Sequence, residues 1–307
     1  MSEATLAVLL ATRNGAAFLD RQLESVAAQD GVRIDVWASD DGSTDATPGL
    51  LSGWAERWTA GRFTLLEGPR QGFADNFRAL LANAEIEADY VALCDQDDVW
   101  LPGKVAAAIA ALAGSGERPA LYCERTITVD EAGNEIGRSP LFVKPVGFAN
   151  ALVQSIAGGN TMVMNRAAHQ LMHEAAGRTD FVSHDWFCYM IISGAGGDVT
   201  YSPEPHVQYR QHGGNLVGSN TGWPARLERL TAAMGGRFTR WNEHNLRTLA
   251  ACRDLLVPAA VARMEAFAAA RRGPLLARLG KLREAGVYRQ SGVGQVLLYL
   301  AVVLGKL

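Results

Sequence analysis

Tyr90-Val91-Ala92-Leu93-Cys94-Asp95-Gln96-Asp97-Asp98 is the stretch that decides the fold, because an apolar run passes directly into three carboxylates. The run has the length of a buried strand. Carboxylates crowded at a strand end repel one another unless a cation lies among them, and a hard divalent cation with oxygen ligands is the usual solution. An acidic surface turn is the alternative. The stretch predicts a strand that ends at a metal-held phosphate ligand.

The residues before this stretch repeat an alternation of apolar strand, polar loop and helix. We expect strands at residues 6–11, 32–38 and 63–67, and helices at residues 18–28, 47–58 and 74–84. Strand and helix repeats of this length imply right-handed parallel crossovers, with ligands bound beyond the carboxyl ends of the strands. The pattern therefore predicts an α/β fold with a mostly parallel sheet flanked by helices. The loops at 12–15, 39–45 and 95–98 should converge on one crevice.

The composition of the 307-residue chain sets further bounds. With 48% hydrophobic and 20% charged residues, it can bury a large core, as one domain or as one domain with an appendage. A net charge of −3 argues against nucleic acid as a partner, which needs concentrated Lys and Arg. The start, Met1-Ser2-Glu3, lacks the basic residues of a signal peptide, so we expect a cytoplasmic protein. Neither a G-x-G-x-x-G after the first strand nor a P-loop occurs, which disfavours dehydrogenases and P-loop NTPases.

Three ordered motifs resemble family 2 glycosyltransferases of the GT-A fold: Val8-Leu9-Leu10-Ala11-Thr12-Arg13-Asn14-Gly15, Ser39-Asp40-Asp41-Gly42-Ser43-Thr44-Asp45, and Asp95-Gln96-Asp97-Asp98. Within that family, residues 94–100 and 209–218 are similar to bacterial rhamnosyltransferases of cell-surface polysaccharide synthesis. The resemblance covers about residues 5 to 220. It implies a GT-A catalytic domain over residues 1–220, followed by a helical C-terminal extension over residues 221–307.

The resemblance implies a nucleoside diphosphate sugar as the donor, either dTDP-L-rhamnose or a UDP-sugar. Asp41 would accept a hydrogen bond from the N3–H of uracil or thymine, since an ionised carboxylate only accepts. Asp40 would support the loop or the ribose. Thr12 and Asn14 would contact the nucleoside or set the loop, and Arg13 would approach the diphosphate. For the two carboxylates, ordinary turn formation is the alternative.

Four other residues are assigned to the donor side by the same resemblance. Asn76 matches a nucleotide-side position, although an Asn at the start of a helix is often a cap. Asp95 would meet the ribose or a metal-bound water, and Gln96 lies beside it in the motif. Arg210 would pair with phosphate bidentately.

The resemblance also implies Mg²⁺ or Mn²⁺ as cofactor. A metal that bridges both phosphates stabilises the negative charge on the departing nucleoside diphosphate. Asp97, the last residue of the D-x-D triplet, is the expected protein ligand, and Asp98 would support it. His212 would complete the coordination or touch the diphosphate, although a lone histidine is often structural.

The expected catalytic base lies in Ser183-His184-Asp185-Trp186-Phe187, which resembles the family's position for that group. Asp185 would take the proton of the acceptor hydroxyl as it attacks the anomeric carbon opposite the leaving group, which inverts the configuration. His184 is a competing base, with an ordinary pKa nearer 6.5. A helix N-cap with a polar neighbour is the alternative reading of this pair.

After about residue 220 the sequence is rich in Ala, Leu and Arg, with helical periodicity. The apolar run at 293–304 is too short to span a bilayer. These helices could pack on the catalytic domain, form a homodimer, or lie in a membrane interface. Because bacterial polysaccharide acceptors are often lipid-linked, the resemblance favours peripheral contact with the inner face of the cytoplasmic membrane.

Together these patterns predict an inverting, metal-dependent glycosyltransferase that moves L-rhamnose from dTDP-L-rhamnose to a saccharide or lipid-linked saccharide acceptor in cell-surface polysaccharide synthesis. A UDP-hexose donor and a non-catalytic sugar-nucleotide-binding module remain as alternatives. A nucleotidyltransferase should carry an early Gly-rich loop with basic residues, which residues 11–15 do not supply.

Overall fold

The computed structural model describes residues 3–213 and 236–307, and within them the centre is a seven-stranded sheet. The first strands are β1 (Thr5–Thr12), β2 (Arg33–Asp40), β3 (Phe63–Glu67) and β4 (Tyr90–Cys94). They pair in parallel in the order β4-β1-β2-β3. The four strands expected from the sequence are therefore confirmed.

The other half of the sheet comes from later strands: β6 (Ala120–Glu124), β9 (Val163–Asn165) and β10 (Asp198–Ser202). β9 runs antiparallel between β4 and β6, and β10 is parallel to β6, so the sheet is mostly parallel. The chain builds outward from β1 on one side and then returns to β4 on the other. Such a switch point leaves a crevice at the carboxyl ends of the strands.

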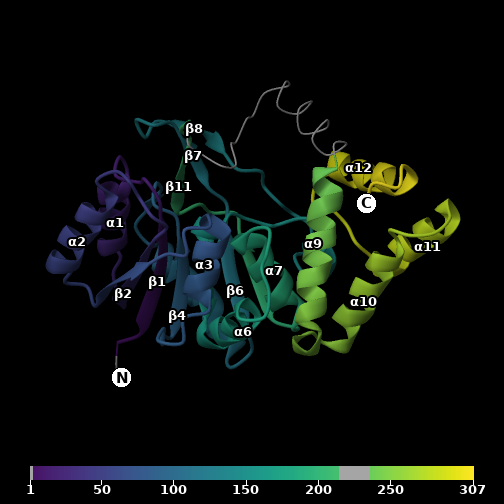
Figure 1. The fold of residues 1–307 in the computed structure, drawn as a ribbon, viewed down its shortest axis with the longest axis horizontal. Coiled ribbons are helices and arrows are strands. Elements are labelled where there is room, and N and C mark those ends of the chain that lie inside the picture. The colour runs from purple at the N-terminus through teal and green to yellow at the C-terminus, as the bar shows by residue number, and fades with distance from the viewer. Residues whose placement is uncertain (1–2, 214–235) are drawn as a thin grey trace.

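Helices cover both faces of the sheet (Figure 1). They are α1 (Leu19–Ala27), α2 (Thr47–Arg57), α3 (Phe73–Leu81), α4 (Lys104–Leu112), α6 (Arg166–Ala176) and α7 (His184–Gly194). In β1, Leu6, Val8 and Leu10 join the apolar cluster of α1, α2 and α4, whereas Leu9 joins that of α3, α6 and α7. Successive strand side chains point to opposite faces, so this alternation fixes the two helical layers.

A smaller sheet follows the acidic residues after β4. Its strands are β5 (Val99–Trp100), β7 (Ile127–Val129), β8 (Glu135–Arg138) and β11 (Val207–Arg210), in the order β5-β11-β7-β8. Short elements complete this region: η1 (Ala113–Ser115), α5 (Phe148–Ala151) and η2 (Gly159–Thr161). Because β5 begins five residues after β4 ends, the small sheet lies beside the crevice.

The C-terminal part is helical, as expected: α9 (Arg237–Ala251), η3 (Arg253–Leu255), α10 (Pro258–Ala269), α11 (Leu275–Ala285) and α12 (Gly292–Val303). Buried side chains of these helices belong to the same apolar cluster as α3, α6 and α7. The predicted boundary between residues 220 and 221, and residues 214–218 of the second rhamnosyltransferase-like motif, lie outside the described residues. Within the described ranges, every helix is too short or too polar to cross a membrane.

Candidate functional site

The loops that follow β1 and β2 are tied together by hydrogen bonds. The Thr44 N–H donates to Asn14 Oδ1 at 2.8 Å, and the Asn14 N–H donates to Ser43 Oγ at 2.8 Å. Asn14 has a φ of 51°, a left-handed conformation that Asn tolerates better than most residues. Asp40 accepts from the Thr12 hydroxyl at 3.0 Å and from the Ser43 N–H at 2.9 Å. Thr12, Asn14 and Asp40 therefore form one rigid rim at the ends of β1 and β2.

Asp41 is buried and holds the loop before α3. Its carboxylate accepts from the backbone N–H groups of Arg70 at 2.6 Å and Gly72 at 2.7 Å. The half-exposed Arg13 guanidinium lies 3.9 Å from this carboxylate. With the Gln71 N–H at 3.3 Å, three amides occupy three of the roughly four lone-pair sites of this carboxylate. The geometry adds a structural function that the sequence did not indicate, and base recognition by Asp41 stays a prediction.

Asn76 and Gln96 hold the loops at the strand ends: Asn76 binds the end of β2, and Gln96 binds the loop after β1. The buried Asn76 amide exchanges hydrogen bonds with Ser39, through the Ser39 hydroxyl at 2.5 Å and the Ser39 carbonyl at 2.9 Å. Asn76 lies inside α3 and is not its N-cap, which is Gly72. Gln96 clamps the backbone of Arg13, accepting from its N–H at 2.8 Å and donating to its carbonyl at 3.0 Å. The loops after β1, β2 and β4 therefore converge, as their positions in the sequence predicted.

The acidic loop after β4 has three carboxylates in different settings. Asp98 is buried and accepts from Asn160 Nδ2 at 2.5 Å and from the Arg210 N–H at 3.1 Å. Asp97 Oδ2 lies 2.7 Å from His212 Nε2. Burial, followed by the charges of Asp98, Asp97 and Asp185, raises the pKa of Asp95 well above its ordinary value. Burial, followed by the charge of Asp97, raises the pKa of Asp98. Burial and the neighbouring negative charges therefore both oppose ionisation of Asp95 and Asp98.

Arg210 holds the backbone of this loop through hydrogen bonds. Its side chain is buried, Nε donates to the Asp97 carbonyl at 3.1 Å, and Nη1 donates to the Glu131 carbonyl at 2.7 Å. The guanidinium also lies over the Phe18 ring, 5.1 Å from its centroid. These contacts join the acidic loop to the turn between β7 and β8. Bidentate pairing of Arg210 with phosphate stays a prediction.

The side chains at the acidic loop fit a divalent cation, although the protein would supply few of the metal ligands. Within residues 3–213 and 236–307, no group of three or more His, Cys, Asp or Glu side chains is arranged to hold a metal. Asp97 and His212 nevertheless come from separate segments to within hydrogen-bonding distance, beside Asp95, whose pKa is raised by burial and then by the neighbouring carboxylates. Mg²⁺ is commonly bound by one or two protein ligands, with water and substrate phosphate supplying the rest.

Asp185 lies in the first turn of α7 and accepts from the Ser155 hydroxyl at 3.0 Å. The ring of the preceding residue, His184, lies against Gly159, and Asn160 donates to Asp98, so the start of α7 lies near the acidic loop. Ser155 is a contact that the sequence did not reveal, because thirty residues separate it from Asp185.

His184 is placed differently from its neighbour. Its ring is buried and stacks on Phe77 with centroids 3.8 Å apart, and neither ring nitrogen has a hydrogen-bond partner in the described structure. Burial lowers the pKa of His184 to about 4. A Cβ on Gly159 would lie 1.9 Å from His184 Nε2, so the glycine makes room for the ring. A buried, neutral ring of this kind is a poor proton acceptor near neutral pH.

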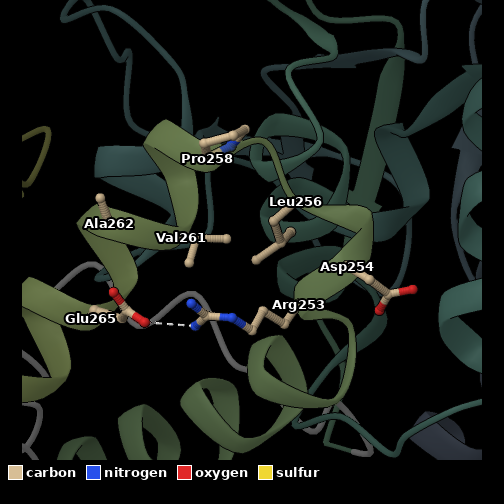
Figure 2. A pocket seen from close by; sticks show the side chains of 7 residues that line it. All are labelled: Arg253, Asp254, Leu256, Pro258, Val261, Ala262 and Glu265. Carbon is tan, nitrogen blue, oxygen red and sulfur yellow. Dashed lines mark ion pairs between the residues drawn. The ribbon is translucent and has the colours of Figure 1, made fainter.

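A surface hollow of about 490 Å³ lies elsewhere, between η3 and α10 (Figure 2). In Figure 2, Arg253 and Glu265 point toward each other across it, and their ion pair spans 2.7 Å. None of the residues predicted for the donor or the base lines this hollow. The hollow is therefore separate from the predicted donor and base residues.

Comparisons with known proteins agree with this geometry. Residues 7–166 match the family model described as glycosyl transferase family 2. The dTDP-rhamnosyl transferase RfbG of Shigella flexneri is 26% identical over 231 residues, which cover 72% of this chain and 78% of that protein. The S. aureus TarS 1–349 structure in complex with UDP-GlcNAc has a TM-score of 0.55 and 16% identity, covering 92% of this chain and 89% of that chain.

A second structural neighbour is the mannosyltransferase PcManGT from Pyrobaculum calidifontis in complex with GDP-Man and Mn²⁺. Its TM-score is 0.54 at 20% identity, covering 99% of this chain and 81% of that chain. At these identities, the two structures show a shared fold alone.

Proposed function

Because the chain belongs to glycosyl transferase family 2 and has the GT-A fold, we propose that this glycosyltransferase moves L-rhamnose from dTDP-L-rhamnose with inversion, in a metal-dependent reaction. The proposed acceptor is a saccharide or lipid-linked saccharide of a cell-surface polysaccharide. The choice of donor is supported by the relative from Shigella flexneri, which is named as a dTDP-rhamnosyl transferase.

One observation carries the proposal: Asp97 and His212, from separate segments, come together near the start of α7, which carries Asp185. Asp97 and His212 lie 2.7 Å apart, and Asp185 contributes to the raised pKa of Asp95. A group-transfer site of this kind needs positive charge for the leaving group and a base for the acceptor.

In this proposal the donor lies against the interlocked loops. Asp41 accepts from the pyrimidine N3–H, and Asn76 keeps the loop after β2 in position through Ser39. Thr12, Asn14 and Asp40 form the wall beside the nucleoside, and Gln96 keeps the Arg13 backbone at the rim. Asp97 and His212 would hold Mg²⁺ or Mn²⁺, which when bound supplies positive charge for the departing diphosphate.

Asp185 is the proposed base. Ser155 donates to one carboxylate oxygen of Asp185, which leaves the other oxygen able to accept the acceptor hydroxyl proton. As the proton moves to Asp185, the hydroxyl oxygen bonds to the anomeric carbon, and the bond from that carbon to the diphosphate breaks. The displacement is direct, so the configuration inverts. His184 is not assigned this role because its ring is buried and its pKa is lowered.

The donor is tested by calorimetric titration of the protein with dTDP-rhamnose, UDP-glucose and UDP-galactose, each with Mn²⁺ and with a chelator. Metal-dependent preference for dTDP-rhamnose is the expected result. Preference for a UDP-hexose would retain the transferase and replace the donor. Binding without any transfer to saccharide acceptors would favour the alternative of a sugar-nucleotide-binding module.

A further inference from the structure

The helix α12 carries an apolar side that no described part of the chain covers. Leu298 and Val302 are buried against the core, whereas Val293 and Val296 are 72% and 67% exposed. Four more apolar side chains between 43% and 48% exposed continue this outer side: Tyr299, Leu300, Val303 and Leu304. We call these six residues the α12 apolar face. Contiguous exposed apolar surface of this kind marks an interaction site more often than isolated exposed residues do.

The C-terminal segment that contains α11 and α12 has a net positive charge, whereas the rest of the chain has a net negative charge. Residues 271–307 contain seven Lys or Arg and one Glu, whereas the remaining chain has 22 basic and 31 acidic residues. Arg272 and Arg283 are exposed, and Arg278 of α11 reaches the end of α12, where its Nη2 donates to the Val303 carbonyl at 3.5 Å. Arg278 therefore lies at the end of the α12 apolar face, and Arg272 and Arg283 are exposed residues of the same basic segment.

We propose that the α12 apolar face docks on an anionic lipid bilayer, with the basic residues of α11 near the headgroups. A helix with an apolar side and basic flanks lies in the membrane interface. α12 has 12 residues, so its length is about 18 Å, which places it along the bilayer surface and not across it. This proposal rests on α11 and α12 and is independent of the proposed donor.

The charge distribution decides between a membrane and a second copy of the chain. A symmetric dimer through this face would bring two strongly basic segments together, and like charges at close range oppose association. An anionic surface attracts the same residues.

Co-sedimentation with vesicles tests the proposal. The full chain should sediment with phosphatidylcholine vesicles that contain phosphatidylglycerol, and much less with phosphatidylcholine alone. The Val296→Ser/Val303→Ser variant should lower the partition coefficient by about tenfold or more, because two apolar side chains are no longer withdrawn from water. The control Leu65→Ser, which changes an exposed residue of β3, should leave it unchanged.

A charge variant separates the electrostatic part. Arg272→Gln/Arg283→Gln should lower binding about fivefold for each charge removed at low salt, and the difference should shrink at high salt. Equal sedimentation with both vesicle types, or no effect of either variant, would overturn the proposal. So would a concentration-dependent dimer, seen by analytical ultracentrifugation without lipid, that Val296→Ser/Val303→Ser abolishes. Donor binding by the variants, measured by calorimetry, should equal that of the parent, which separates this proposal from the proposed function.

Discussion

At the scale of single residues, the crevice depends on side chains that serve the protein backbone and face the proposed ligand at the same time. Asp41 holds the amides of residues 70–72, and Arg210 holds the carbonyls of Asp97 and Glu131. The sequence predicted that these residues belong to the site, because they follow strand ends or lie in a recognisable motif. It could not predict their backbone partners, which lie 29 to 113 residues away in the chain. Only the folded structure brings them together.

Asp185→Asn tests the proposed base. An amide oxygen is a far weaker proton acceptor than a carboxylate, so turnover should fall by about 10²- to 10⁴-fold. Donor affinity should stay unchanged, because Asp185 is not assigned a donor contact. Transfer is measured with the donor chosen by calorimetry, and Ser155→Ala serves as a comparison with a smaller loss. Full turnover by Asp185→Asn would remove this residue from the mechanism.

Asp97→Asn tests the proposed metal ligand. Loss of one carboxylate charge should weaken metal-dependent binding of the donor by about tenfold or more, since charge-assisted contacts contribute well over 1 kcal/mol each. Titrations with Mn²⁺ and with chelator measure the difference. Asp30→Asn, at an exposed position after α1, is the control and should bind as the parent does. Unchanged metal dependence in Asp97→Asn would contradict the assignment of the acidic loop.

At the scale of elements, the N-terminus of α7 is held in place by His184, which packs between Phe77 of α3 and Gly159 of η2. Asp185 is the next residue, so the position of the proposed base depends on this contact. The sequence predicted the strands and helices of the first hundred residues, because period-2 and period-3.6 patterns are local. It could not predict the fit of the His184 ring over Gly159, which depends on three elements distant in sequence.

Gly159→Ala should therefore disturb the site without changing any polar group. The added Cβ would lie 1.9 Å from His184 Nε2, so the ring must move and take the start of α7 with it. Overpacking of this kind costs about 1–3 kcal/mol of unfolding free energy. We expect reduced turnover with nearly normal donor affinity. The control is Gly49→Ala in α2, where a Cβ meets nothing within 4 Å. Urea unfolding and transfer assays on both variants measure the effects.

His169 of α6 makes stability depend on pH. Burial, followed by the charge of His173, lowers the pKa of His169 to about 4, against an ordinary value of 6.5. Between these values the unfolded chain binds a proton that the folded chain does not, so unfolding free energy is highest above pH 6.5 and falls toward pH 4. The loss from this residue is roughly 3 kcal/mol at most. Urea unfolding across this range should show a smaller loss for His169→Gln than for the parent, and equal losses would contradict the buried neutral ring.

At the scale of the whole molecule, the C-terminal helices share the core of the catalytic part. Leu249, Cys252 and Phe267 are buried in the apolar cluster that also contains Leu9 of β1 and Phe187 of α7. The composition of the sequence after residue 220 predicted helices, because it is rich in Ala, Leu and Arg. It left open whether they pack on the catalytic domain, because an apolar stripe on a helix does not identify its partner.

Phe267→Ala tests whether these parts unfold together. The substitution should cost about 3–5 kcal/mol, because a fully buried ring is removed. If the core is shared, native-state hydrogen exchange should speed up in peptides from β1 as well as in those from α10, since both open in the same cooperative unit. Leu276→Ala, at a position 84% exposed on α11, is the control and should change neither. Faster exchange confined to α9 through α12 would instead establish residues 221–307 as a separate folding unit, and would make the shared apolar cluster a contact between two domains.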